Sequence, residues 1–165
     1  MKKLLTFVAI SALVAASSLA DTFKIPKDSP IASITFPSSG WKVEADDESI
    51  NANTEDDAIY INVEFNDADS LEGAIQETFG FLKKNKVTID KSTEKKTEAN
   101  FHGMAIVDFS WSGEDSEGKA NISLTVLAVS EKKALLMLYW ASPEGEAKHK
   151  AELNEILQSI KSLAK

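Results

Sequence analysis

Few side chains in this sequence can act as bases near neutral pH. The 165 residues include two histidines, His102 and His149, and no cysteine. Neither histidine belongs to a known catalytic spacing, because the chain has no Gly-x-Ser-x-Gly elbow, no His-Glu-x-x-His pair and no glycine-rich phosphate loop. An active site needs several converging groups with distinct roles. The sequence therefore predicts no catalytic residue and no enzymatic activity.

Acidic side chains form three short runs near predicted turns, at 46–48, 55–57 and 67–69. Carboxylate oxygens are the ligands that Ca²⁺ prefers. The third run begins like a calcium-binding loop, but Leu71 stands at its fifth position and Gly73 at its seventh, where the loop requires a donor at the fifth position and Gly at the sixth. The first two runs are interpreted as caps of a hairpin. We predict no metal site and no cofactor.

The net charge limits the class of partner. The formal charge of the chain is −8, and all of its positive charge comes from lysine, since it contains no arginine. An acidic surface repels phosphate backbones, and the guanidinium group that binds phosphate through two parallel hydrogen bonds is missing. Nucleic acid is therefore not an expected partner, and the expected partner is an unidentified protein or small ligand.

Residues 1–20 have the pattern of a signal peptide. Two lysines follow Met1, and an uncharged apolar stretch runs to Ala16. Small residues, Ser18 and Ala20, stand at the third position and at the last position before the expected cleavage site. We expect cleavage after Ala20, followed by a periplasmic or extracellular location without stable membrane insertion. Asp21 stands where a lipoprotein would have its acylated cysteine.

The remaining chain predicts one domain at 31–165, preceded by a loose segment at 21–30 that is rich in Pro, Asp and Ser. Period-two alternation predicts strands at 31–36, 41–45, 59–65, 103–112, 119–130 and 134–141, with a short strand at 87–89. Helical spacing predicts one helix at 70–85 and a longer one from Ser142 through an apolar stripe that ends at Leu163. The stripe consists of Leu153, Ile156, Leu157, Ile160 and Leu163. The predicted fold class is α+β, an antiparallel sheet packed by two main helices.

Short motifs resemble those of the PsbP-like and DcrB-like domains of bacterial envelopes and photosynthetic lumens. They are the opening at 34–41 (ITFPSSGW), the strand start at 102–105 (HGMA) and the ending at 153–161 (LNEILQSIK). The resemblance implies a PsbP-like α/β/α sandwich. It also implies roles that are diverse and largely non-catalytic.

Pleating of the predicted strands indicates a candidate binding face. If Ile59, Ile61, Val63 and Phe65 point into the core, the alternate residues of that strand point to the opposite face. The same reasoning assigns alternate residues of the 103–112 strand to that face. The predicted binding residues are Tyr60, Asn62, Glu64, Asp108 and Ser110, with Glu64 and Asp108 as a close acidic pair.

These observations favour an exported, non-catalytic binding or accessory domain of the cell envelope. Two alternatives remain open at this point. One is an envelope enzyme that depends on a metal or another ligand, and the other is a purely structural accessory protein. The identity of the partner is not encoded in any motif.

Overall fold

The structure is a computed structural model that describes residues 20–164. The predicted signal peptide lies outside the described residues, apart from Ala20. Among residues 20–164, no helix combines the length and the apolar character needed to cross a bilayer.

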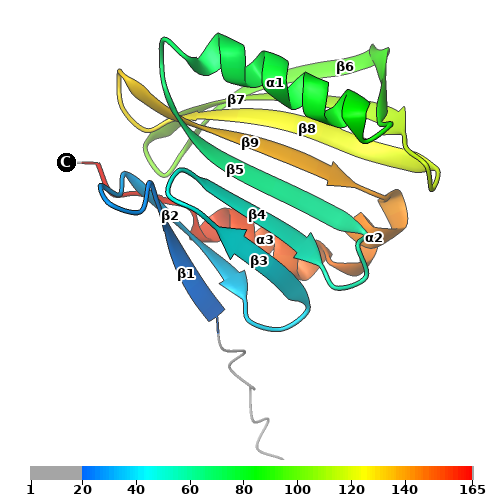
Figure 1. Ribbon diagram of the computed structural model, residues 1–165, viewed down its shortest axis with the longest axis horizontal. Coiled ribbons are helices and arrows are strands. Elements are labelled where there is room, and N and C mark those ends of the chain that lie inside the picture. Colours follow the sequence, from blue (N-terminus) through cyan, green and yellow to red (C-terminus); the bar gives the residue numbers. More distant parts are fainter. Residues whose placement is uncertain (1–19, 165) are drawn as a thin grey trace, which may run out of the picture.

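Seven antiparallel strands form the larger sheet, in the order β3-β4-β5-β9-β8-β7-β6 (Figure 1). The strands are β3 (Trp41–Ala45), β4 (Ser49–Thr54), β5 (Ile59–Asp67), β6 (Thr88–Phe101), β7 (Met104–Glu114), β8 (Lys119–Ala128) and β9 (Lys133–Ala141). The short turns between β7, β8 and β9 require antiparallel pairing, because a parallel crossover needs a dozen or more residues.

A smaller sheet contains β1 (Ala20–Ile25), β2 (Ala32–Pro37) and β10 (Lys161–Ser162), in the order β1-β2-β10. The expectation of a loose segment at 21–30 is wrong for its first half, since β1 pairs with β2 along its full length. Apolar contacts explain this order. Ile25 is buried, and the ring of Phe23 meets the ring of Phe36 edge-on at 6.0 Å.

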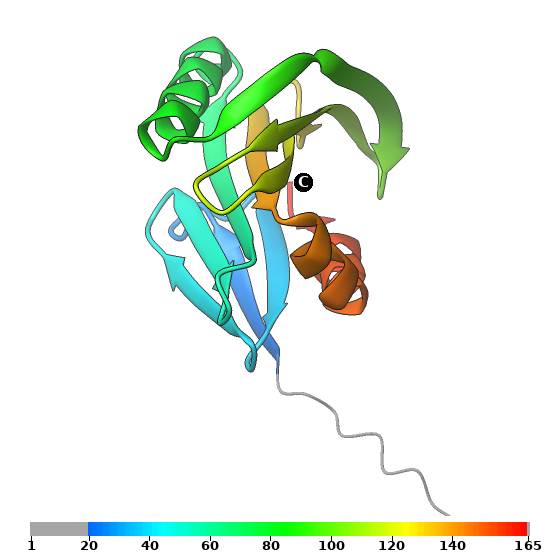
Figure 2. The ribbon, with the colours of Figure 1, turned by 90° about the vertical axis from the view of Figure 1, so that its right-hand side faces the viewer.

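α1 (Leu71–Lys84) lies on one side of the larger sheet. α2 (Pro143–Lys148) and α3 (Lys150–Ser159) lie on the other side, where α3 packs mainly on β2 of the smaller sheet (Figure 2). The first predicted helix is confirmed as α1. The second is wrong as one continuous element, because it is interrupted at His149 and ends before Ile160, where the backbone becomes extended. Its predicted start is confirmed, since Ser142 Oγ accepts a hydrogen bond from the Gly145 amide at 3.0 Å.

The predicted fold class, one antiparallel sheet packed by two main helices, is therefore wrong. Residues 20–164 form two sheets and three short helices, and strands make up most of the regular structure in this part of the chain. The difference arises because three further segments form strands through backbone pairing. The apolar pattern does not mark these segments as strands; they lie at 20–25, 49–54 and 91–101.

Each face of the larger sheet carries its own apolar cluster. The cluster under α1 includes Leu82, Trp111 and Leu124. The cluster on the α3 side joins the two sheets and includes Phe36 and Ile61. The larger sheet thus separates two hydrophobic cores.

The apolar stripe predicted for the last helix is only partly buried. Leu153, Ile156 and Ile160 are buried, whereas Leu157 and Leu163 are 37% and 40% exposed. The stripe therefore does not face the core along its full length. Leu157 lies instead at the edge of a cavity under α3.

Candidate functional site

The five residues predicted to share one face lie on opposite faces of the larger sheet. Tyr60, Asn62 and Glu64 lie on the α1 side, where they line a small pocket that also includes α1 residues. Asp108 and Ser110 lie on the other side. The predicted acidic pair of Glu64 and Asp108 is therefore wrong.

The strand register explains the separation. Asn62 on β5 stands opposite Leu138 of β9, and Leu138 stands opposite Leu124 of β8. Asp108 belongs to the alternate row, opposite Thr125, which stands opposite Met137. Residues opposite one another in an antiparallel sheet point to the same face, so Asn62 and Asp108 point to different faces.

The pocket beside α1 has a volume of about 230 Å³. Its polar groups largely satisfy one another, because Asn51 Oδ1 accepts hydrogen bonds from the Tyr60 hydroxyl at 2.7 Å and from Asn62 Nδ2 at 3.1 Å. Burial, and then the negative charge of Glu77, raises the pKa of Glu64. This side of the sheet therefore has a small pocket in which the polar side chains are hydrogen-bonded to one another.

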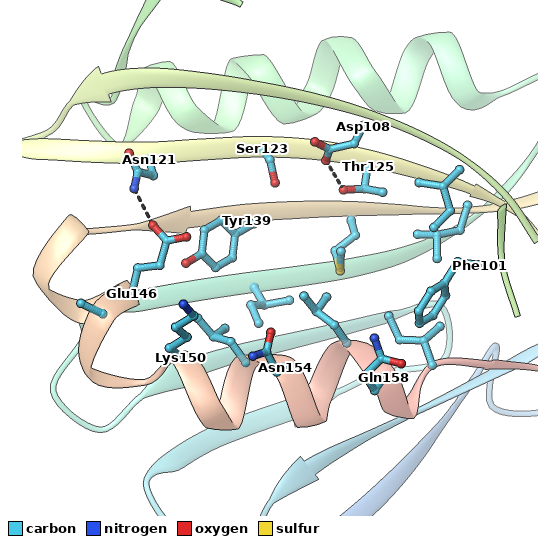
Figure 3. Close-up of a pocket in the computed structure, with 18 of the residues that line it drawn as sticks. Phe101, Asp108, Asn121, Ser123, Thr125, Tyr139, Glu146, Lys150, Asn154 and Gln158 are labelled. Carbon is cyan, nitrogen blue, oxygen red and sulfur yellow. Dashed lines mark hydrogen bonds between the residues drawn. The ribbon is translucent and has the colours of Figure 1, made fainter. Parts of the chain in front are cut away.

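A larger cavity of about 740 Å³ lies between the sheet and the α2–α3 segment (Figure 3). This volume is within the range of small-molecule sites in proteins. The end near Phe101 is mainly apolar, although Gln158 lies beside Phe101, and polar side chains gather at the other end, around Tyr139 (Figure 3). Its apolar lining comprises Ile61, Phe101, Ile106, Leu127, Met137, Leu153, Leu157 and Ile160, and its polar lining includes Asp108, Asn121, Ser123, Thr125, Tyr139, Glu146, Lys150, Asn154 and Gln158.

Two hydrogen bonds organise the polar side chains of the cavity (Figure 3). Asn121 Nδ2 on β8 donates to Glu146 Oε2 on α2 at 2.5 Å and so connects the sheet to the helices. Thr125 Oγ1 donates to Asp108 Oδ1 at 2.6 Å. Asp108 is thus the one member of the predicted acidic pair that reaches this cavity.

The sequence reasoning missed Tyr139, Glu146, Lys150 and Asn154. For three of them a signal existed, since 146, 150 and 154 recur at spacing four and so fall on one side of successive helical turns. No such signal existed for Tyr139, which lies within the apolar run LLMLYWA of β9.

His149 anchors the junction of α2 and α3 to the outer strands. Its Nε2 lies 3.2 Å from Asp56 Oδ2, in the β4–β5 turn, and its Nδ1 lies 3.1 Å from Glu152 Oε2. Glu152 also accepts a hydrogen bond from Trp41 Nε1 at 2.9 Å, and Lys148 Nζ lies 2.6 Å from Asp56 Oδ2. The imidazole is therefore held between two carboxylates.

We expect the stability of the protein to fall as pH rises through the titration of His149. Burial alone would lower the pKa of His149, but its hydrogen bonds to Asp56 and Glu152 outweigh burial and raise it above the usual value. A raised folded-state pKa contributes stability that is complete below the unfolded pKa of about 6.5 and is lost as pH rises through the folded value. Urea unfolding followed between pH 5.5 and pH 8.5 measures this loss.

The control for this prediction is the other histidine. His149→Gln should make the fall in unfolding free energy with pH smaller. His102→Gln should leave that fall in place, because His102 Nδ1 lies 3.0 Å from the Ile160 carbonyl oxygen and, among residues 20–164, His102 forms no ion pair with a carboxylate. The same slope in wild type and His149→Gln would contradict the prediction.

The acidic runs act in turns and ion pairs. Asp46 accepts hydrogen bonds from the amides of Glu48 and Ser49 in the β3–β4 turn, at 2.9 and 2.6 Å. Asp67 pairs with Lys133 at 3.0 Å. Within the described part of the chain, no three His, Asp or Glu side chains are grouped so as to hold a metal ion.

Comparisons with known proteins show the fold. No family model matches the chain, and no curated protein matches it in sequence. It is similar to the cyanobacterial PsbP protein CyanoP of Synechocystis sp. PCC 6803, with a TM-score of 0.59, 8% identity, and coverage of 90% of this chain and 95% of that one.

It is also similar to LpqN of Mycobacterium tuberculosis, a protein described as involved in cell envelope biogenesis. That match has a TM-score of 0.52, 12% identity, and coverage of 87% of this chain and 91% of LpqN. The comparisons do not confirm the DcrB-like part of the resemblance. At these identities the likeness shows the fold alone, and the chain has a PsbP-like fold.

Proposed function

We propose that this protein is an exported, non-catalytic binding protein of the cell envelope that holds a small amphipathic molecule in the cavity under α2 and α3. The observation that carries the proposal is the division of that cavity into an apolar end and a polar end. A mainly apolar pocket with a few placed polar groups is the usual form of a small-molecule site.

The contacts of the ionisable side chains support binding rather than catalysis. Both histidines are engaged elsewhere, His149 with Asp56 and Glu152, and His102 with the Ile160 carbonyl. In the cavity itself, the carboxylates of Asp108 and Glu146 accept hydrogen bonds from the sheet. Such contacts orient a carboxylate as a fixed polar group of a binding site.

The location in the envelope rests on two further observations. The first twenty residues have the order of a signal peptide, with a positive start, an apolar stretch and small residues before Asp21. LpqN, whose fold is similar, is described as involved in cell envelope biogenesis. An amphipathic ligand is a molecule that an envelope contains.

The test uses the neutral apolar fluorophore N-phenyl-1-naphthylamine and a variant that fills the cavity. Ser123 points into the cavity from β8 (Figure 3). We expect saturable fluorescence enhancement with the wild-type protein and at least a tenfold loss of affinity in Ser123→Phe, because the added ring occupies the space of the ligand. Circular dichroism and the unfolding midpoint establish that the variant is folded.

The matched control is Ser130→Phe, which adds the same ring at an exposed position outside the described cavities. It should bind the fluorophore as the wild type does. Equal affinity in Ser123→Phe and wild type would exclude this cavity as the site, and no saturable binding in wild type would favour a purely structural accessory role. Chemical conversion of a bound envelope molecule would favour the enzyme alternative.

A further inference from the structure

The Tyr139 hydroxyl is an unusual group in the polar end of the cavity. Its oxygen is buried and has no hydrogen-bond partner among the described residues. Figure 3 shows the Tyr139 ring in the cavity, which Glu146 and Lys150 also line. A buried polar group without a partner costs free energy, and such groups commonly mark a place where a ligand or water completes the hydrogen bond.

The protonation state of Tyr139 makes it a hydrogen-bond donor. Burial, and then the negative charge of Glu146, raises the pKa of Tyr139 well above its usual value. The hydroxyl therefore keeps its proton throughout the physiological range. A neutral phenol can donate one hydrogen bond and accept another, so an oxygen or nitrogen atom placed in the cavity would supply the missing partner.

The charges around the cavity disfavour an anionic ligand. Two carboxylates line it, Asp108 and Glu146, against one ammonium group, that of Lys150. The chain as a whole carries a net charge of −8. A carboxylate or phosphate at the polar end would lie among like charges, at a cost that grows as water is excluded.

We infer that Tyr139 determines the specificity of the cavity for neutral single-chain amphiphiles, whose head places a hydroxyl or carbonyl oxygen on the Tyr139 hydroxyl. This inference rests on the proposed function and specifies the ligand class of the same cavity. The alkyl chain lies along the apolar end toward Phe101 and Leu127. The polar side chains of Asn154 and Lys150 lie near the head.

Two probes of equal chain length separate head chemistry from chain burial. 1-Monodecanoylglycerol has a neutral head with ester and hydroxyl oxygens, and decanoate has an anionic head. Each displaces N-phenyl-1-naphthylamine at concentrations below its micelle threshold. We expect the wild-type protein to bind monodecanoylglycerol at least ten times more tightly than decanoate.

The variant Tyr139→Phe removes only the hydroxyl. Its affinity for monodecanoylglycerol should fall about tenfold, equivalent to about 1.4 kcal/mol, while its affinity for the fluorophore stays unchanged. The matched control is Tyr60→Phe, since the Tyr60 hydroxyl lies on the α1 side, where it donates to Asn51. That variant should bind both compounds as the wild type does.

The outcomes distinguish this inference from the proposed function. Suppose that the wild-type protein binds the fluorophore. The role of Tyr139 is then overturned, and the binding cavity is not, if Tyr139→Phe leaves the affinity for monodecanoylglycerol unchanged or if the wild type binds decanoate more tightly than monodecanoylglycerol. Absence of saturable fluorophore binding in the wild-type protein overturns both.

Discussion

Replacing Ile156 by alanine is expected to lower the free energy of unfolding by about 2–5 kcal/mol, the range for truncating a large buried aliphatic side chain. Ile156 lies on α3 with no exposed surface, in the cluster that joins α3 to both sheets. The truncation removes apolar contacts and leaves a space that the surrounding strands can only partly fill. Urea unfolding followed by tryptophan fluorescence measures the change.

The neighbouring residue provides the matched control. Leu157→Ala removes a side chain of similar size that is 37% exposed at the edge of the cavity. We expect it to cost less than about 1 kcal/mol, because much of that side chain already contacts water. Equal losses of unfolding free energy in the two variants would contradict the assignment of Ile156 to the core and of Leu157 to the edge of the cavity.

Replacing Gly145 by alanine is expected to lower the free energy of unfolding by about 1–3 kcal/mol, the usual cost of overpacking. A Cβ atom at Gly145 would lie 2.5 Å from Ala58 Cβ and 2.9 Å from Ser142 Oγ. The first turn of α2 rests directly on the β4–β5 turn, where the Ser142 amide donates to the Ala58 carbonyl at 3.0 Å. The added methyl group must push α2 outward. Urea unfolding measures the loss, and displacement of Glu146 should also weaken fluorophore binding.

Gly80→Ala is the control for backbone effects. Gly80 is an exposed residue of α1, and a Cβ atom there would have no neighbour within 4 Å. Alanine favours a helix over glycine by about 1 kcal/mol, so this variant should be more stable than wild type. A comparable gain in Gly145→Ala would show that α2 is not in close contact with the β4–β5 turn.

Elements with a strong apolar period could be predicted from the sequence. Leu71 to Lys84 repeats apolar residues at helical spacing, and β5 alternates them with polar residues. The polar stretch 91–101 of β6 could not be predicted, because an edge strand needs no apolar face. Its lysines and glutamates fit an edge that avoids pairing with other chains. Backbone pairing with β7 alone defines this strand.

The site could be predicted only in part. Alternation divides each strand into two rows, but it does not show which row of β7 shares a face with which row of β5. Both faces of the sheet are covered, so an apolar row such as Ala105 to Trp111 indicates burial without indicating the side. The alternation alone therefore does not separate Asp108 from Glu64. Only the pairing of β7 with β8, of β8 with β9 and of β9 with β5 separates them.

The contact between α3 and β2 has a consequence for how the protein folds. The Thr35 amide donates to Ser159 Oγ at 2.8 Å, although 124 positions separate them in sequence, and β10 pairs with β2 as well. Long-range contacts of this kind slow folding, because a long loop must be closed before they form. Ile34 and Phe36 in β2 share their apolar cluster with Ile156 and Ile160, which the ribosome adds long after β2. That part of the core can therefore be completed only after α3 has been made.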